Sequence, residues 1–337
     1  MTVISRDAAS AASAHPPDAT QNQRAARWLE RTDRLFFSLT FASALLVLAM
    51  FCAMFIMLLK GSWPALDAFG FRFFITQVWN PVKDQYGILA QISGTLITSF
   101  LAMLIAVPIG LGIAIFLTEI CPPVLRRSIG VAIELLAGVP SIIYGIWGLF
   151  VFAPLFQRTA QPWLIDLFAP VPVLSTLFAG PPYGIGMFTA SLILAIMILP
   201  LIASISRDVF ETVPPMLKEA AYGLGCTTHE VVLKVVLPYA RSGVVGGAML
   251  ALGRALGETM AVTFVIGNAH KIQSSLFAPG TTISAAIANE FTEATTPLYV
   301  SSLLTAGFCL FFITFIILAA AQLMLRRLER LPGGTHS

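Results

Sequence analysis

Long apolar stretches separated by short polar segments make up most of the chain from residue 35 onward. A bilayer hydrocarbon core is about 30 Å thick, so an α-helix needs about 20 largely apolar residues to cross it. The first such stretch, Leu35 to Leu59, carries no charge and is bounded by Arg34 and Lys60. We therefore expect six transmembrane helices. Their predicted bounds are 35–59, 91–117, 129–152, 186–206, 243–266 and 299–325.

Composition supports the same class of protein. Of the 337 residues, 57% are hydrophobic and 11% are charged, and the mean hydropathy is +0.84. Soluble domains carry about 25% charged residues, so a soluble fold is excluded. The four cysteines show no CxxC or other metal-ligand spacing, and we expect neither disulfides nor a metal site. The expected fold class is an all-α polytopic membrane protein.

Lysine and arginine are unevenly distributed between the two sides of the predicted helices. The two termini and the second and fourth loops hold 14 of them, against 5 in the other loops. Because cytoplasmic segments are enriched in these residues, both termini and the fourth loop are predicted to be cytoplasmic. The first span is too long for the apolar region of a signal peptide, so we expect it to remain as an anchor.

Composition also divides the chain into three parts. Residues 1–27 are rich in Ala, Ser, Pro and Gln and are predicted to form a disordered cytoplasmic tail. Residues 28–90 hold the first transmembrane helix and an outer loop. Residues 91–330 form the transmembrane core, which contains the cytoplasmic loop 207–242.

The fourth loop has an internal pattern of its own. Residues 216–221 are strong helix formers, and Gly223 and Gly225 then supply a break. One of the threonines at 227–228 is a suitable N-cap for a second helix, which we expect Pro238 to end. Alternatively, the pattern is accidental and the loop is only solvated.

Six residues of this loop are informative because of their spacing. They are Glu219, Ala220, Ala221, Gly225, Leu237 and Pro238. Their spacing resembles the EAA loop of ATP-binding cassette (ABC) importer permeases, with Val235 where isoleucine is usual. In that family the loop forms a coupling helix that sits in a groove on a cytoplasmic ATPase, which implies the same role here. Small alanines would allow close approach, Gly225 a sharp turn, and Glu219 a charged contact; Gly223 belongs to the same coupling segment.

No nucleotide-binding sequence accompanies this loop. The pattern GxxxxGK[ST] is absent, and no glycine directly precedes a lysine anywhere in the chain. We therefore expect a non-catalytic subunit without a cofactor of its own. ATP and Mg²⁺ would bind to a partner ATPase.

Arg254 and Glu258 place opposite charges four residues apart inside the fifth predicted span. On a continuous helix they share a face and can pair. An arginine at the bilayer centre costs about 2.5–3.5 kcal/mol on insertion scales, so it should face protein or water. Two interpretations remain. The pair is a structural ion pair, or Arg254 attracts a permeating anion while Glu258 holds or neutralises it between transport events.

The third predicted span combines a carboxylate with a helix-breaking sequence. Glu134 lies near one end, and Gly138 and Pro140 interrupt the helix. The freed carbonyls are tolerated where protein or a water-filled cavity satisfies them, so Ser141 is a candidate to contribute a hydroxyl to a pathway. Alternatively, the glycine and the proline only bend the helix.

Two segments narrow the resemblance. Residues 134–141, ELLAGVPS, and 253–262, GRALGETMAV, are similar to segments of permeases from the bacterial phosphate-specific transport (Pst) family, the second to its C-type subunit. The likeness covers roughly residues 30–330. It implies a type I ABC importer permease (MetI-like) fold and phosphate as the substrate. The pathway residues that it implies are Arg254, Glu258, Thr259, Glu134 and Ser141.

The resemblance also implies partners and a location. The implied partners are a second, A-type permease subunit, a cytoplasmic ATPase dimer, a periplasmic or extracellular phosphate-binding protein and membrane lipid. No nucleic acid is expected. The implied location is the bacterial cytoplasmic membrane. From the residues alone, one arginine fits sulfate or molybdate as well as phosphate. The rival function is a self-sufficient carrier in which Glu258, Arg254 and Glu134 relay protons or ions. Such carriers often show repeated halves, and we find none here.

The third loop, 153–185, is rich in proline and aromatic residues. Aromatic side chains near span ends usually mark the membrane interface. We also expect this loop to form part of the docking surface for a binding protein. The aromatic candidates are Trp163, Phe168, Phe178 and Tyr183.

Overall fold

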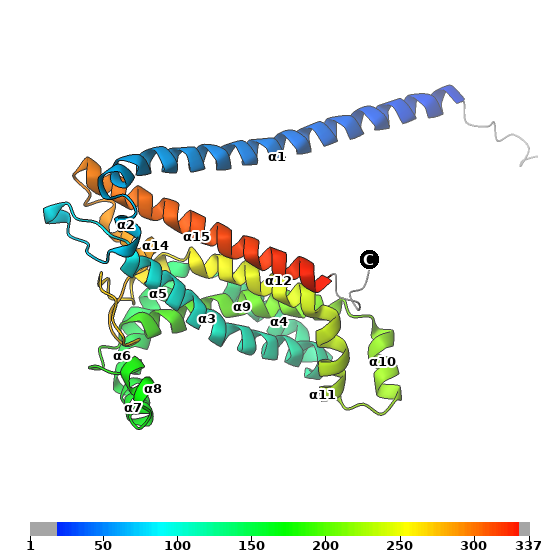
Figure 1. Ribbon diagram of the computed structural model, residues 1–337. Coiled ribbons are helices and arrows are strands. Elements are labelled where there is room, and N and C mark those ends of the chain that lie inside the picture. The colour runs from blue at the N-terminus through cyan, green and yellow to red at the C-terminus, as the bar shows by residue number, and fades with distance from the viewer. Residues whose placement is uncertain (1–18, 330–337) are drawn as a thin grey trace, which may run out of the picture. The chain divides into compact units, whose positions relative to one another are not determined.

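The computed structural model describes residues 19–329, and within that range the chain forms helices and loops without strands (Figure 1). The chain falls into two units, residues 1–57 and 58–337. Within the described residues, six helical segments are long and apolar enough to cross a membrane, which confirms the predicted number. They are Thr32–Phe69, Leu89–Ile120, Ser141–Arg158, Met187–Glu211, Thr228–Leu256 and Pro297–Arg327.

The first unit contains one described element, the N-terminal part of α1 (Ala19–Phe69). Residues 1–18 of the predicted tail lie outside the described residues, and the helix already begins at Ala19. Large apolar side chains from Leu35 to Met57 are exposed, as expected for a helix surrounded by lipid.

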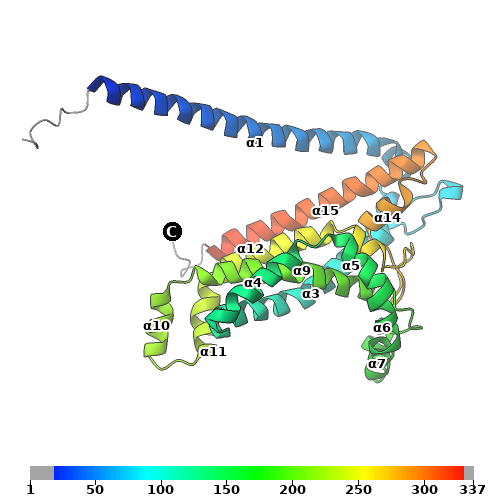
Figure 2. The same cartoon turned by 180° about the vertical axis from the view of Figure 1, so that it is seen from behind.

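The second unit is a helical bundle. Its long helices α3 (Leu89–Ile115), α9 (Met187–Glu211), α12 (Leu237–Leu256) and α15 (Pro297–Glu329) run alongside one another (Figure 1). Seen from behind, α4 (Pro123–Ala137) and α5 (Ser141–Trp147) lie on the near face of this bundle (Figure 2). α10 (Pro215–Gly223) and α11 (Thr228–Val231) lie at one end. At the opposite end lie α2 (Arg72–Ile75), a 3₁₀ turn (Pro81–Lys83), α6 (Ala153–Arg158), α7 (Ala160–Phe168), α8 (Pro172–Leu177) and α14 (Ile283–Glu290).

The core of the bundle forms where α3 packs along α9. Small residues allow this close approach. A Cβ added to Gly110 would lie 2.7 Å from the Ile202 side chain. The buried residues at the centre include Ala102, Ala106, Ile193, Leu194 and Ile198.

The third predicted span is wrong in its extent. The sequence predicted one helix over 129–152, whereas α4 ends at Ala137 and α5 begins at Ser141. Pro140 has no N–H to donate and disfavours a helical conformation at Val139. The spanning segment therefore starts at Ser141 and continues through a π-helical turn, η4 (Gly148–Phe152), into α6.

The fifth predicted span is displaced toward the N-terminus, and Pro238 does not end the helix before it. α11, a second π-helical turn, η5 (Val232–Val236), and α12 form one continuous run, Thr228–Leu256. The π turn changes the hydrogen-bond register, so Pro238 falls in the first turn of α12, where a missing N–H costs little. The run stops at Leu256 instead of reaching residue 266, and α13 (Met260–Thr263) follows separately.

Candidate functional site

Residues 215–236 fold into the predicted helix, glycine turn and second helix. α10 begins at Pro215 and ends at Gly223. Gly225 then has a φ of +84°, a left-handed conformation that suits glycine. Thr227 is the N-cap of α11, because its hydroxyl accepts from the Glu230 N–H while the Glu230 carboxylate accepts from the Thr227 N–H.

Gly225→Ala is expected to destabilise this turn by about 1 kcal/mol, because alanine must adopt a positive φ. Gly223 also has open space around it, but its backbone is helical, so Gly223→Ala is the matched control and should be neutral or slightly stabilising. Hydrogen exchange of the amides in residues 221–231 measures the difference in the detergent-solubilised subunit. Equal protection in the two variants would contradict the expectation.

α10 presents two different faces. Met216, Glu219, Ala220 and Gly223 recur at helical spacing and are exposed. Ala221 is only 8% exposed and belongs to a buried cluster. The two alanines of the motif therefore have different environments, one on the surface and one holding α10 to the bundle. The other buried members of the cluster are Ala114, Phe210, Val213, Val231, Val236 and Ala240.

The last two motif residues lie at the start of α12. Leu237 is half-buried and packs against the same cluster, and Pro238 is exposed in the first turn. They do not belong to the exposed face of α10. They form the joint between the loop and the long helix instead.

A further residue of α10, which the sequence did not single out, makes a long-range contact. Lys218 Nζ lies 2.5 Å from Glu119 Oε1, on the π-helical turn η3 (Phe116–Ile120) that follows α3. The two residues are 99 positions apart in the chain. Only their charges are visible in the sequence, and these do not identify the partner.

The two interrupted helices pack against each other. A Cβ on Gly145 of α5 would lie 2.9 Å from the Met260 carbonyl oxygen and 3.1 Å from Ala261 Cα, both in α13. The Tyr144 hydroxyl donates to the Leu136 carbonyl at 2.9 Å and so connects α5 to α4 across the first break. The glycine at 145 therefore permits backbone contact between the segments that follow the two breaks.

Arg254 and Glu258 are separated by the end of α12. Arg254 is exposed in its last turn and interacts electrostatically with Tyr144. Glu258 lies beyond the helix, where its Oε1 accepts from the Ala261 N–H at 3.3 Å. The ion pair that their spacing allowed on a continuous helix is not formed, since none joins them among the residues that the structure describes. The Arg254 side chain is thus exposed, without an ion-pair partner among the described residues.

Thr259 also lies in this second break. Its hydroxyl donates to the Gly257 carbonyl at 3.3 Å, and its carbonyl accepts from the Thr263 hydroxyl at 2.7 Å. The structure therefore brings Thr259 and Glu258 into one short connection directly after the turn that carries Arg254.

Glu134 forms an ion pair with an arginine that the sequence did not single out as its partner. Its Oε1 lies 2.8 Å from Arg207 Nη2 of α9, and Arg207 also contacts Asp208. Arg207 reaches across Gly130, where a Cβ would lie 2.6 Å from Nη1. Glu134 thus links α4 to α9, whereas Ser141 is the half-buried first residue of α5 beside the break.

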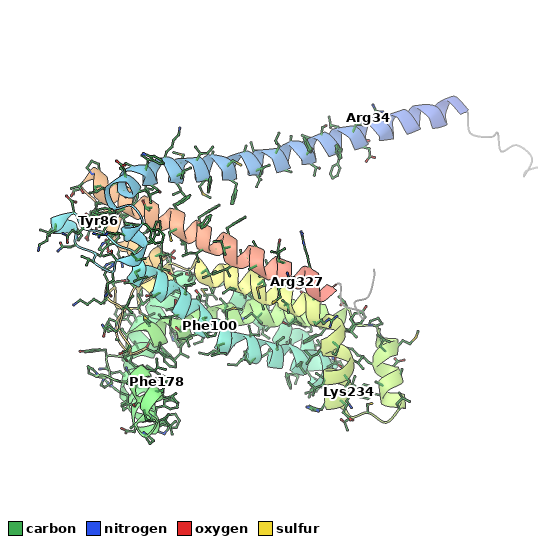
Figure 3. The ribbon with its side chains drawn as sticks, in the orientation of Figure 1. Arg34, Tyr86, Phe100, Phe178, Lys234 and Arg327 are labelled. Carbon is green, nitrogen blue, oxygen red and sulfur yellow. The ribbon has the colours of Figure 1, made fainter. Side chains whose placement is uncertain are left out.

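A carboxylate at the end that carries α14 gathers three donors. Glu290 accepts from Trp79 Nε1, from the Tyr299 hydroxyl at 2.7 Å and from His270 Nε2 at 2.7 Å. Burial alone would raise the pKa of Glu290, but the hydrogen bonds from His270, Tyr299 and Trp79 outweigh it, so its pKa lies below the usual value. Trp79 stacks on His270, and Tyr86 lies edge-on to Trp79. Tyr86 is labelled at this end of the bundle in Figure 3. The sequence did not single out Glu290 or His270.

Glu290→Gln is expected to lower the thermal unfolding midpoint of the subunit near pH 7. The folded pKa of Glu290 lies below the unfolded value of about 4.3, so its stabilising effect is present above that pH and is lost as pH falls through the folded pKa. The wild-type and variant midpoints should therefore converge at low pH. Unfolding scans in detergent between about pH 7 and pH 3 test this. The control is Glu293→Gln, at an exposed carboxylate. The expectation would be contradicted if the difference between the wild-type and Glu290→Gln midpoints stayed the same at every pH.

The aromatic residues of the third loop divide into two groups. Phe168 and Phe178 stack at 4.7 Å, and Phe178 also packs against Phe277 at 5.3 Å. Trp163 and Tyr183 are 62% and 55% exposed. Only the second pair therefore remains available as part of a docking surface.

Comparison with known proteins agrees with this architecture. Residues 106–330 match the family described as binding-protein-dependent transport system inner membrane component. The phosphate transport system permease protein PstC of Mesorhizobium japonicum is 63% identical over 302 residues, which cover 90% of this chain and 92% of that protein. PstC of Pasteurella multocida is 57% identical over 299 residues, covering 89% and 93%.

A solved structure supports the fold. It is described as a bacterial alginate ABC transporter in complex with an alginate pentasaccharide-bound periplasmic protein, and one of its chains aligns with a TM-score of 0.60 at 17% identity. The alignment covers 89% of this chain and 98% of that one. The predicted ABC importer permease fold is confirmed. The chain belongs to the binding-protein-dependent transport system inner membrane component family and, within it, to the PstC permeases.

Proposed function

We propose that this chain is the permease subunit of an ATP-driven phosphate importer and forms half of its anion path. The observation that carries the proposal is the likeness, over about nine-tenths of the chain, to proteins named phosphate transport system permease PstC. The geometry supports it, because Arg254 presents a guanidinium beside a break in the helix. Arginine is well suited to the oxygens of phosphate.

The chain is the non-catalytic part of the machine. The exposed face of α10, which includes Glu219 and Ala220, enters a groove on a cytoplasmic ATPase. ATP and Mg²⁺ bind to that partner ATPase dimer. A second, A-type permease subunit forms the other half of the path, and a phosphate-binding protein delivers the anion from outside.

Closure of the ATPase dimer moves α10 and with it the continuous helical run that starts at Thr228. From Thr228 to Arg254 this run extends roughly 40 Å at 1.5 Å per residue. Movement at the loop therefore reaches the turn that carries Arg254 through one helix. Access to the anion path then alternates between the two sides of the membrane.

The proposed orientation places both termini and the α10–α11 end in the cytoplasm. The uneven distribution of lysine and arginine supports this orientation. The opposite end, with Trp163 and Tyr183 exposed, then faces the binding protein.

Reconstitution tests the proposed function. The chain is placed in proteoliposomes with its A-type partner, the ATPase and a binding protein, and uptake of labelled phosphate and sulfate is compared. We expect ATP-dependent uptake of phosphate in at least about tenfold excess over sulfate, equivalent to about 1.4 kcal/mol of discrimination. Equal uptake of both anions would overturn the substrate, and uptake by the chain alone, driven by an ion gradient, would establish the carrier instead.

A further inference from the structure

The inward face of α10 carries a cation as well as a small apolar residue. Lys218 and Ala221 are three positions apart and both point toward the bundle, with the Lys218 side chain 19% exposed. The face opposite to Met216, Glu219 and Ala220 is therefore an attachment surface. Its polar contact is the Glu119 carboxylate, of which 6% of the side chain is exposed.

Glu119 lies at a junction of elements. It belongs to η3, where the hydrogen bonding of α3 changes from α to π. In the same turn, the Thr118 carbonyl accepts from Arg126 Nη2 of α4 at 2.6 Å. η3 is therefore connected both to α3, which it continues, and to α4.

The chain itself connects the loop to only two of the core helices. α9 leads into α10, and the run through α11 leads into α12. α3 has no such covalent connection, although it packs along α9 in the core. The Lys218–Glu119 ion pair joins α10 directly to the end of α3.

A partly buried ion pair resists separation, because either charge left alone would be poorly solvated. α10 therefore cannot shift relative to η3 without breaking this contact. By contrast, Lys234 and Glu230 lie 3.3 Å apart within one helical run, with 71% and 39% of their side chains exposed. Such an exposed pair connects no other element of the fold, and it contributes little to stability.

We propose that the Lys218–Glu119 ion pair is a positioning contact that passes movement of the coupling segment to α3, in addition to the covalent routes through α9 and α12. The inference rests on the proposed function, because it concerns how ATPase closure reaches the membrane helices. Lys218 and Glu119 touch neither nucleotide nor anion in this scheme. They keep α10 and α3 moving together.

The test uses the complete reconstituted importer. Lys218→Met and Glu119→Gln remove one charge each, and the double variant Glu119→Lys with Lys218→Glu exchanges them. We expect both single variants to assemble and to hydrolyse ATP with kcat and KM within about twofold of wild type, while phosphate transported per ATP falls about tenfold, equivalent to about 1.4 kcal/mol of lost coupling. The exchanged pair should recover at least half of the loss. Lys234→Met is the matched control and should retain the wild-type ratio.

Two results would overturn the inference. One is a wild-type ratio of phosphate to ATP in both single variants. The other is failure of the exchanged pair to restore the ratio, including the case in which the single variants do not assemble. If they do not assemble but the exchanged pair restores assembly and the ratio together, the contact is supported. Absence of ATP-dependent phosphate uptake in the wild-type complex would instead count against the proposed function.

Discussion

Arg254→Gln is expected to reduce ATP-dependent phosphate uptake at least about 100-fold while the complex still assembles. Hydrogen bonds to charged groups are worth about 1.5–3 kcal/mol, so loss of two from a guanidinium corresponds to roughly two orders of magnitude. The side chain is exposed and makes no ion pair among the residues that the structure describes, so glutamine can replace it without leaving a buried charge unpaired. Uptake into proteoliposomes, with co-purification of the ATPase, measures both properties.

Two further variants make this result specific. Arg254→Lys keeps the charge but loses the planar fork, so an intermediate loss of about tenfold is expected. Arg34→Gln removes an exposed arginine from α1 and should leave uptake unchanged. Normal uptake in Arg254→Gln would exclude this residue from the anion path and leave it with a structural role only.

Ala220→Trp is expected to abolish co-purification of the ATPase while the subunit itself stays folded. Ala220 is exposed on α10, so the isolated subunit can accommodate a large side chain there. In a close-packed interface, overpacking costs about 1–3 kcal/mol, and at the upper value the affinity for the ATPase falls about 100-fold. The measurements are the ATPase retained on purification and the thermal unfolding midpoint of the subunit.

The neighbouring alanine provides the contrast. Ala221 is 8% exposed inside the cluster that holds α10, so Ala221→Trp should lower the unfolding midpoint of the isolated subunit. Ala44→Trp on α1 is the control for a large residue at an exposed helical position and should affect neither measurement. If Ala220→Trp retains the ATPase at the wild-type level, this face of α10 is not the docking surface.

The spanning segments and the coupling loop could be predicted because their signals are local. Hydropathy over about 20 residues is a property of a single segment, and it does not depend on which helices lie nearby. The same holds for the turn at Gly225 and the cap at Thr227, where each residue acts on the backbone within a few positions. Helix ends were predicted less well. The π turn before Pro238 and the break at Gly257 depend on hydrogen-bond register and on packing against α5.

By itself, the sequence determined that this is a six-span permease with a helix, turn and helix in its fourth loop. Only the tertiary structure decided that Ala221 is buried while Ala220 is exposed, that Glu134 pairs with Arg207, and that Lys218 reaches Glu119. Each of these outcomes depends on how a helix is rotated about its axis and on which distant segment lies against it. Those quantities follow from packing summed over the whole bundle, and residue spacing within one helix does not contain them.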